Sequence, residues 1–158
     1  MPRVTLTTED MGAAVVLARD RWMEALRSKR QDSVFAKDWF GDFDSHLKGA
    51  VGEIAYAKWS NQYQRFSLNR FHGGGDDTDI GNVAVRYRRN PGHDLILRRD
   101  DPSDLVYVLV RGTPPDVEIA GWIRGEDARS ELHLRDYGGH GEALFVPVNY
   151  LRKMEDLS

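Results

Sequence analysis

The first sixty residues carry apolar side chains at intervals of three and four, which is the spacing of a helix buried on one face. This spacing predicts an amphipathic helix from Thr7 or Thr8 to about Arg30. Glu9 and Asp10 would lie in its first turn, where negative charge complements the helix dipole. The apolar positions of this helix are Met11, Ala14, Val15, Ala18, Trp22, Ala25 and Leu26.

A second helix is predicted from Asp44 or Ser45 to Trp59, and it is apolar on nearly all sides. A helix of that kind packs against more than one neighbour. The segment before it, Asp32 to Asp44, is rich in aromatic residues, and we expect an ordered connection whose aromatic rings fill the core.

Glu53 interrupts this apolar helix. Its neighbours one turn away are small or apolar: Gly49, Ala50, Tyr56 and Ala57. A carboxylate on such a face costs several kcal/mol unless a cation or a hydrogen-bond donor meets it. Glu53 is therefore a candidate functional residue that needs a partner.

After residue 60 the spacing of apolar residues changes from about 3.6 to two, which is typical of strands. Pro114 and Pro115 separate two of these runs and predict a hairpin. The expected strands are Tyr63–Leu68, Val83–Arg88, Leu95–Leu97, Leu105–Arg111, Val117–Ile123 and Ala143–Val146, with a short helix or irregular crossing at Glu126–His133 and a closing helical turn at Asn149–Met154. Helices first and strands later predict one mixed α/β or α+β domain over residues 1–158.

Composition narrows the functional classes. The chain has 158 residues, 41% of them hydrophobic, and no cysteine, so we expect one globular domain without disulfides or a cysteine zinc site. No window of about 18 apolar residues predicts a membrane span, and no secretory signal is visible, so a cytoplasmic location is expected. The histidines lack zinc-site spacing, and phosphate-binding glycine motifs and a nucleophile elbow are missing, so no nucleotide cofactor is expected.

The net charge of −3 does not indicate nucleic-acid binding, but the distribution of charge is more informative. The segment from Arg86 to Arg111 contains six arginines and no lysine. Alternation along a strand puts Ala84, Arg86 and Arg88 on one face, which we expect to line a cleft or meet solvent. Arginine suits bidentate phosphate contacts, although solvated strand edges would also explain these residues.

A glycine-rich acidic loop, Gly73–Asp79, leads into the Val83–Arg88 strand. Carboxylates at such a place can bind Mg²⁺, which polarises a phosphate and activates a water molecule. Asp79, five residues before Ala84, is the candidate ligand beside Glu53, with Asp76 or Asp77 as helpers. The alternative is a solvated turn, because glycine and aspartate are favoured in turns for backbone reasons.

The Gly52-Glu53 pair, the Asp79-Ile80-Gly81 loop and the Ala84-Val85-Arg86 triplet together resemble the PD-(D/E)xK nuclease superfamily, in particular its compact phage-type members. This resemblance implies a restriction-endonuclease-like core, a mixed central sheet flanked by helices. It also implies a Mg²⁺ or Mn²⁺ ion at Glu53 and Asp79, and DNA as the partner. Arg86 would be the catalytic cation, and the residues on DNA would be Arg86, Arg88 and Arg89.

Two positions depart from the pattern of the superfamily. Ala84 stands where the second acidic residue is expected, and a methyl group cannot coordinate metal. Arg86 replaces lysine and keeps the charge, but it cannot readily give up a proton. The leading hypothesis is a Mg²⁺-dependent DNA endonuclease or exonuclease. The alternative is a catalytically inactive accessory protein of phage or prophage origin that uses this fold to bind DNA or a protein, including a second copy of itself.

Overall fold

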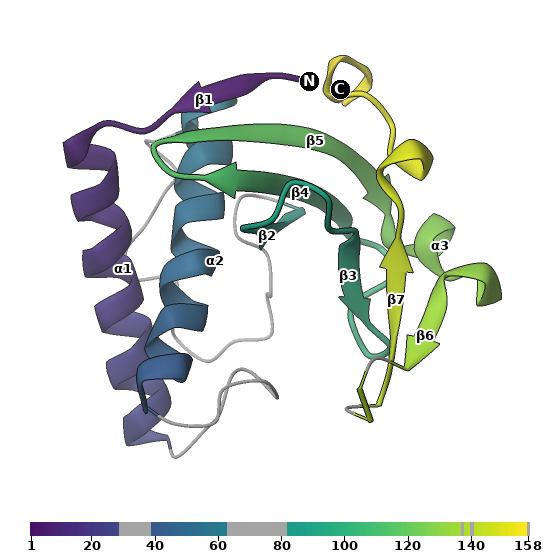
Figure 1. Ribbon diagram of the computed structural model, residues 1–158, viewed down its shortest axis with the longest axis horizontal. Coiled ribbons are helices and arrows are strands. Elements are labelled where there is room, and N and C mark those ends of the chain that lie inside the picture. Colours follow the sequence, from purple (N-terminus) through teal and green to yellow (C-terminus); the bar gives the residue numbers. More distant parts are fainter. Residues whose placement is uncertain (29–38, 63–81, 137, 140, 158) are drawn as a thin grey trace.

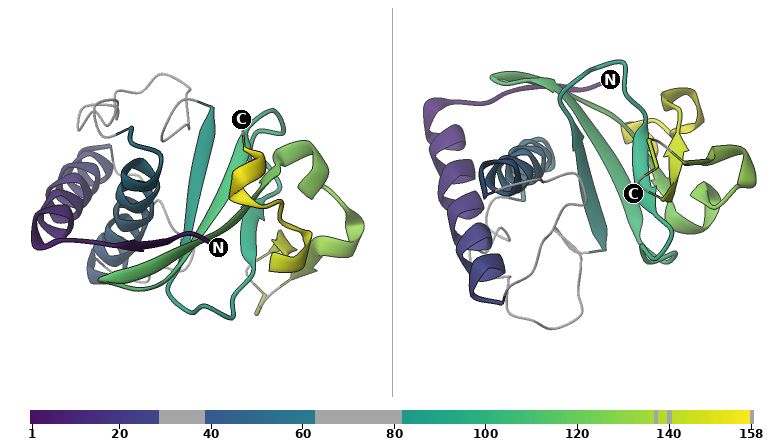
Figure 2. Two further views of the ribbon diagram at one scale, coloured as in Figure 1. Left: turned by 90° about the horizontal axis from the view of Figure 1, so that it is seen from above. Right: turned by 60° about the horizontal axis from the view of Figure 1, so that its bottom comes forward.

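The computed structural model describes residues 1–28, 39–62, 82–136, 138–139 and 141–157. Within these ranges the chain forms layers (Figures 1 and 2): helix α1 (Thr8–Arg27) on the outside, then helix α2 (Trp39–Trp59), a four-stranded sheet and a three-stranded sheet. The described part of the chain is therefore of mixed α+β class, as predicted. None of its helices is long and apolar enough to cross a membrane.

Helix α1 begins where the sequence predicts, because Thr7 and Asp10 form a capping box. The Thr7 hydroxyl accepts a hydrogen bond from the Asp10 amide at 3.1 Å, and the Asp10 carboxylate accepts one from the Thr7 amide at 2.7 Å. The predicted inner face was partly wrong. Val15 is 46% exposed, whereas Leu17 and Arg21 are buried against α2.

Helix α2 begins at Trp39, earlier than predicted, so the last part of the expected aromatic connection, from Trp39 to Asp44, is helical instead. The first part of that connection lies outside the described residues. The polar residues that suggested a helix start make contacts inside the helix: the Ser45 hydroxyl donates to the Gly41 carbonyl, and Asp44 pairs with Lys48. Phe43 packs edge-on against Trp22 of α1, with ring centroids 5.5 Å apart, as expected of a core aromatic. Phe40 is 87% exposed, so that side chain does not fill the core.

The larger sheet has the strand order β1-β5-β4-β2. Strand β2 (Val83–Arg88) runs parallel to β4 (Val106–Thr113), while β5 (Asp116–Arg124) is antiparallel to both β4 and β1 (Arg3–Thr5). The predicted hairpin at Pro114 and Pro115 is confirmed as the β4–β5 pair. The three-residue β1 was not predicted, because so short a segment shows no alternation.

The smaller sheet has the order β3-β7-β6, built from β3 (Leu95–Arg98), β7 (Glu142–Val146) and the unpredicted β6 (Leu134–Asp136). The chain between β5 and β6 forms helix α3 (Gly125–Ala128) and a 3₁₀ turn (Glu131–His133), and further 3₁₀ turns lie at Val148–Tyr150 and Met154–Asp156. The strand predicted at Tyr63–Leu68 lies outside the described residues.

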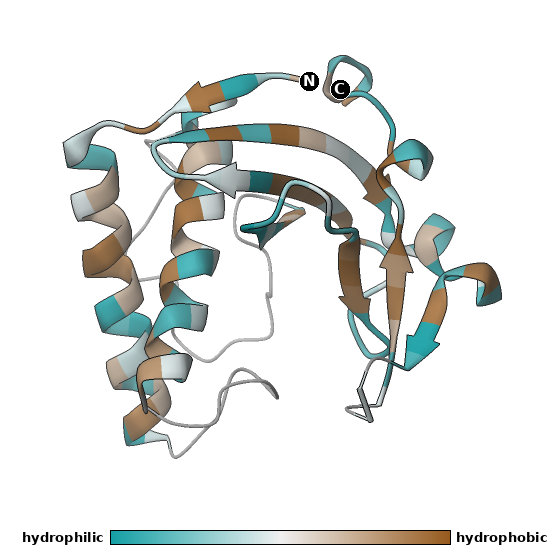
Figure 3. Cartoon of the chain, viewed as in Figure 1, coloured by the Kyte–Doolittle hydropathy of each residue, from teal (hydrophilic) through white to brown (hydrophobic). Residues whose placement is uncertain are grey.

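Each face of the larger sheet is covered by its own apolar cluster. The helices cover the face that carries Val83, Val85 and Val108, and the smaller sheet covers the opposite face, which carries Ala84 and Leu109. Figure 3 shows hydrophobic residues on both helices and along the strands of both sheets. A sheet covered on both faces leaves its polar side chains room only at strand ends and edges.

Gly52 sets how closely α2 approaches β2. A Cβ atom added at Gly52 would lie 2.9 Å from the Cβ of Tyr87 and 3.4 Å from Cγ1 of Val85. The Tyr87 Cβ is fixed by its backbone, so it cannot move aside as the tip of a side chain could. A residue larger than glycine would therefore push the helix off the strand.

Gly52→Ala should lower the free energy of unfolding by about 1–3 kcal/mol, since the clash with Tyr87 outweighs the better helix propensity of alanine. Gly49 is the matched control, because a Cβ added there meets nothing within 4 Å. Gly49→Ala should raise stability by roughly 0.5–1 kcal/mol in the same urea titration. Equal effects of the two substitutions would contradict the close approach.

Candidate functional site

Glu53 lies on α2 and is buried, with 4% of its surface exposed. Its two carboxylate oxygens accept hydrogen bonds from Nη1 and Nη2 of Arg21 on α1, which makes a bidentate ion pair between the helices. The sequence predicted that Glu53 needs a cation or a hydrogen-bond donor, and among the described residues that partner is Arg21. Its carboxylate thus faces α1, while the adjacent Gly52 faces Val85 and Tyr87 on β2.

Arg21 was missed because helix faces were assigned from apolar residues alone. Arg21 lies one turn from both Leu17 and Ala25, and both of these residues are fully buried. An arginine in the middle of a buried helix stripe needs an acidic partner. Read together with the isolated Glu53, this position could have been found from the sequence.

Ala84 does not face a cleft or solvent, so this expectation was wrong. Its exposed fraction is 0%, and it packs in the cluster between the two sheets, next to Tyr107 on β4. The physical reason is the smaller sheet, whose β3 and β7 cover that face of β2. Only small or apolar side chains fit there without a desolvation cost.

Arg86, the expected catalytic cation, is part of the local scaffold. Its Nη2 donates to the Asp101 carboxylate at 3.1 Å, and its guanidinium lies 5.3 Å from the centroid of the Tyr107 ring. The Asp101 carboxylate also accepts a hydrogen bond from the Arg98 amide at 2.8 Å. Arg86 therefore ties β2 to the turn that follows β3.

The described residues do not fit a Mg²⁺ or Mn²⁺ site. Both oxygens of Glu53 are engaged by Arg21, and Ala84 offers no oxygen ligand in its side chain. Asp79 lies outside the described residues, as do Asp76 and Asp77. In the part of the chain that the structure describes, no three His, Asp or Glu side chains gather closely enough to hold one metal ion.

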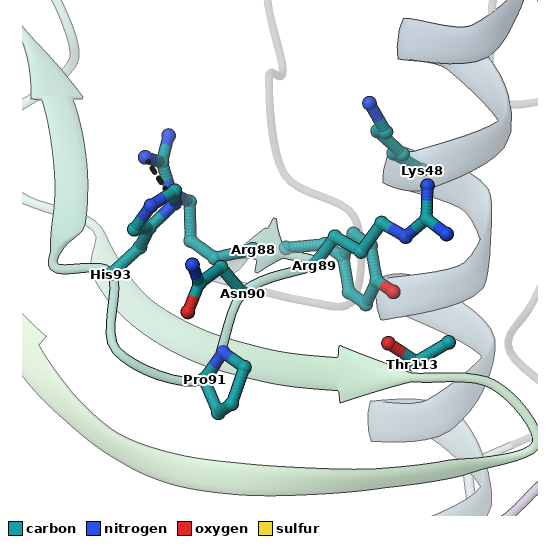
Figure 4. Close-up of a pocket in the computed structure, with 8 residues that line it drawn as sticks. Lys48, Arg88, Arg89, Asn90, Pro91, His93 and Thr113 are labelled. Carbon is teal, nitrogen blue, oxygen red and sulfur yellow. Dashed lines mark hydrogen bonds between the residues drawn. The ribbon is translucent and has the colours of Figure 1, made fainter.

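A pocket of about 660 Å³ lies where β2 leaves the larger sheet. Its walls come from α2, from the end of β2 with the turn after it, and from the end of β4 (Figure 4). The pocket is lined by Lys48, Tyr87, Arg88, Arg89, Asn90, Pro91, His93 and Thr113. Four of these side chains are basic and none is acidic. Five of the lining residues were neither predicted site residues nor part of β2: Lys48, Asn90, Pro91, His93 and Thr113.

Arg88 occupies one side of the pocket. Its Nη2 lies 3.1 Å from Nδ1 of His93, and since arginine only donates hydrogen bonds, this imidazole nitrogen must be the acceptor. Burial lowers the pKa of Arg88, and the nearby carboxylate of Asp94 acts in the opposite direction. The Arg88 Nε is buried, and it has no hydrogen-bond partner among the described residues.

Arg89 and Lys48 occupy the other side, where Figure 4 shows both side chains beside α2. Arg89 is exposed, and the Lys48 ammonium pairs with Asp44 one turn earlier on α2, at 2.5 Å. Tyr87 forms the wall beneath them, held by a hydrogen bond of 2.6 Å from its hydroxyl to the Gly112 carbonyl. Burial raises the pKa of Tyr87, so the ring adds no negative charge to the pocket at neutral pH.

Comparisons of the chain with protein-family models, with curated proteins and with solved structures give no match. A function must therefore follow from the side chains themselves. They form two separate units: an internal ion pair between the helices, and a basic pocket at the end of β2.

Arg21→Met should lower the free energy of unfolding by about 3–5 kcal/mol, because it leaves the buried Glu53 carboxylate without its cation. The double variant Arg21→Met, Glu53→Leu removes both charges and should recover most of this loss. Urea denaturation of the two variants tests the pair. A loss below about 1 kcal/mol in the single variant would mean that water already reaches Glu53.

Ala84→Glu combined with Arg86→Lys rebuilds the acidic-x-lysine triplet of the resembled superfamily. It should lower stability by about 3 kcal/mol or more, because the new carboxylate enters an apolar cluster. Arg86→Lys alone is the control and should cost less, since it keeps a charge near Asp101. If the double variant has the same melting temperature as the control, position 84 is exposed to solvent instead of buried.

Proposed function

We propose that this chain binds nucleic acid through its phosphate groups, on a restriction-endonuclease-like core that has no metal-dependent cleavage. The observation that supports this most directly is the pocket at the end of β2, whose titratable lining groups are basic apart from the tyrosine. Arg88 and Arg89, which the resemblance implies as DNA contacts, both line it. Arg86 does not, because it is engaged by Asp101.

The charge of the pocket is local and is unrelated to the net charge of −3. Asp44 and Asp94 lie near its basic groups, but neither lines it. Arginine and lysine contacts to phosphate release counterions from the nucleic acid, so affinity falls as salt rises. Such contacts are independent of sequence and position the backbone.

Two positions that would have to act on metal and water support binding without cleavage. Glu53 is held by Arg21, and Ala84 supplies a methyl group inside the core. A binding protein needs neither position, because phosphate contacts come from the end of β2. Nucleic-acid binding without catalysis therefore uses the residues that this chain has.

The test compares wild type with the double variant Arg89→Gln, Lys48→Gln. Both side chains are at least partly exposed, so the variant should fold. Its affinity for labelled DNA should fall, and the slope of log K against log salt should flatten by up to about two units, one for each lost phosphate contact. Fluorescence anisotropy at several salt concentrations, with single-stranded and duplex DNA, measures both quantities.

Arg99→Gln is the matched control, since Arg99 is an exposed arginine that pairs with Glu142 outside the pocket. It should bind DNA like wild type. An unchanged affinity in the double variant would reject this pocket and favour a protein-interaction role. Mg²⁺- or Mn²⁺-dependent nicking of a plasmid by wild type, abolished by Asp79→Ala, would instead restore the nuclease hypothesis.

A further inference from the structure

We infer that the pocket at the end of β2 recognises a phosphate monoester at the end of a nucleic-acid strand, in preference to the diesters within it. This inference rests on the proposed function, and it names the chemical group that the pocket selects. Three properties of the lining residues support it: their charge, the donors that remain available, and the size of the pocket.

Charge is the first property. Lys48 and Arg89 carry two permanent positive charges on one side of the pocket, and Arg88 carries a third on the opposite side beside His93 (Figure 4). The peripheral carboxylates of Asp44 and Asp94 lie near these cations but do not line the pocket. A phosphate diester carries one negative charge, whereas a monoester carries about −1.5 to −2 at neutral pH. Arg88 is a partly desolvated cation, and an anion of higher charge compensates that desolvation better.

The remaining hydrogen-bond donors are the second property. The Asn90 Oδ1 accepts a hydrogen bond of 2.8 Å from the Gly92 amide, which leaves its NH₂ group as the end able to serve a ligand. Because His93 accepts from Arg88 at Nδ1, its neutral ring carries the hydrogen on Nε2. Thr113 adds a hydroxyl. A monoester has three terminal oxygens that accept hydrogen bonds, one more than an internal diester.

Size is the third property. A volume of about 660 Å³ lies within the range of a site for one small ligand. The turn containing Asn90 and Pro91 lies on one side of it, and α2 lies on the other (Figure 4). A strand that ends here places one phosphate among the basic groups, while an uninterrupted strand would have to enter and leave the same small space.

The experiment uses three short oligonucleotides of one sequence with an internal fluorophore, carrying a 5′-phosphate, a 3′-phosphate or only hydroxyl ends. We expect wild type to bind one phosphorylated form about tenfold more tightly than the hydroxyl form at fixed salt, an increment typical of a charge-assisted contact. The 5′ and 3′ arms identify which end is recognised. Inorganic phosphate should compete with the preferred oligonucleotide more effectively than sulfate or chloride at equal ionic strength.

Arg89→Gln should reduce this tenfold preference to less than about twofold, while Arg99→Gln should retain it. Equal affinity of wild type for the three oligonucleotides would overturn the inference. If that equal affinity still depended on Arg89 and Lys48, the proposed nucleic-acid binding would survive and only the preference for strand ends would be rejected. Binding that is indifferent to Arg89 and Lys48 would reject both.

Discussion

Burial of strand β2 on both faces is the constraint on which the rest of this structure depends. Gly52 lets α2 lie directly on Val85 and Tyr87, and the smaller sheet encloses Ala84 from the other side. A strand enclosed in this way cannot present charged groups in its middle without paying their desolvation. Its arginines therefore lie toward the end of the strand. Arg86 forms an ion pair at the margin of the covered part, Arg88 is half-buried, and Arg89 is exposed. The basic pocket lies at the end of β2, where the strand is no longer covered on both faces.

The ion pair between Arg21 and Glu53 solves a related problem on the helix side. Two helices that pack through small and apolar side chains can slide or rotate with little penalty, whereas a bidentate guanidinium–carboxylate pair is satisfied in one alignment only. The pair therefore contributes to the register of α1 on α2, together with the pairing of Asp10 and Lys58 nearer the other end. It also keeps the carboxylate of Glu53 inside the protein, away from the basic pocket, where it would weaken anion binding.

Periodicity predicted most elements of this fold because the burial of α1, α2 and the longer strands follows regular spacing. Periodicity did not predict the elements whose formation or bounds depend on tertiary contacts. β1 and β6 are three residues each and exist through their partners, and α2 extends to Trp39 because Asp44 and Ser45 are used within the helix. For the site, the sequence predicted correctly that Glu53 needs a cation or a hydrogen-bond donor as a partner. It could not show that Ala84 faces a second sheet, or that Lys48 and Thr113, from distant elements, line the same pocket as the arginines at the end of β2.

The order of the layers has a consequence for how the molecule opens. The middle strand β4 has a neighbouring strand on each side and an apolar cluster on each face, so its amides should exchange with solvent only when the described domain unfolds as a whole. Helix α1 contacts the sheet chiefly through α2. We therefore expect α1 to detach cooperatively while the rest of the described domain stays folded. Its detachment would separate Arg21 from Glu53, so in the partly opened state both charges would be hydrated as separate ions. The equilibrium between closed and open forms should therefore respond to ionic strength, even though the closed form hides both charges.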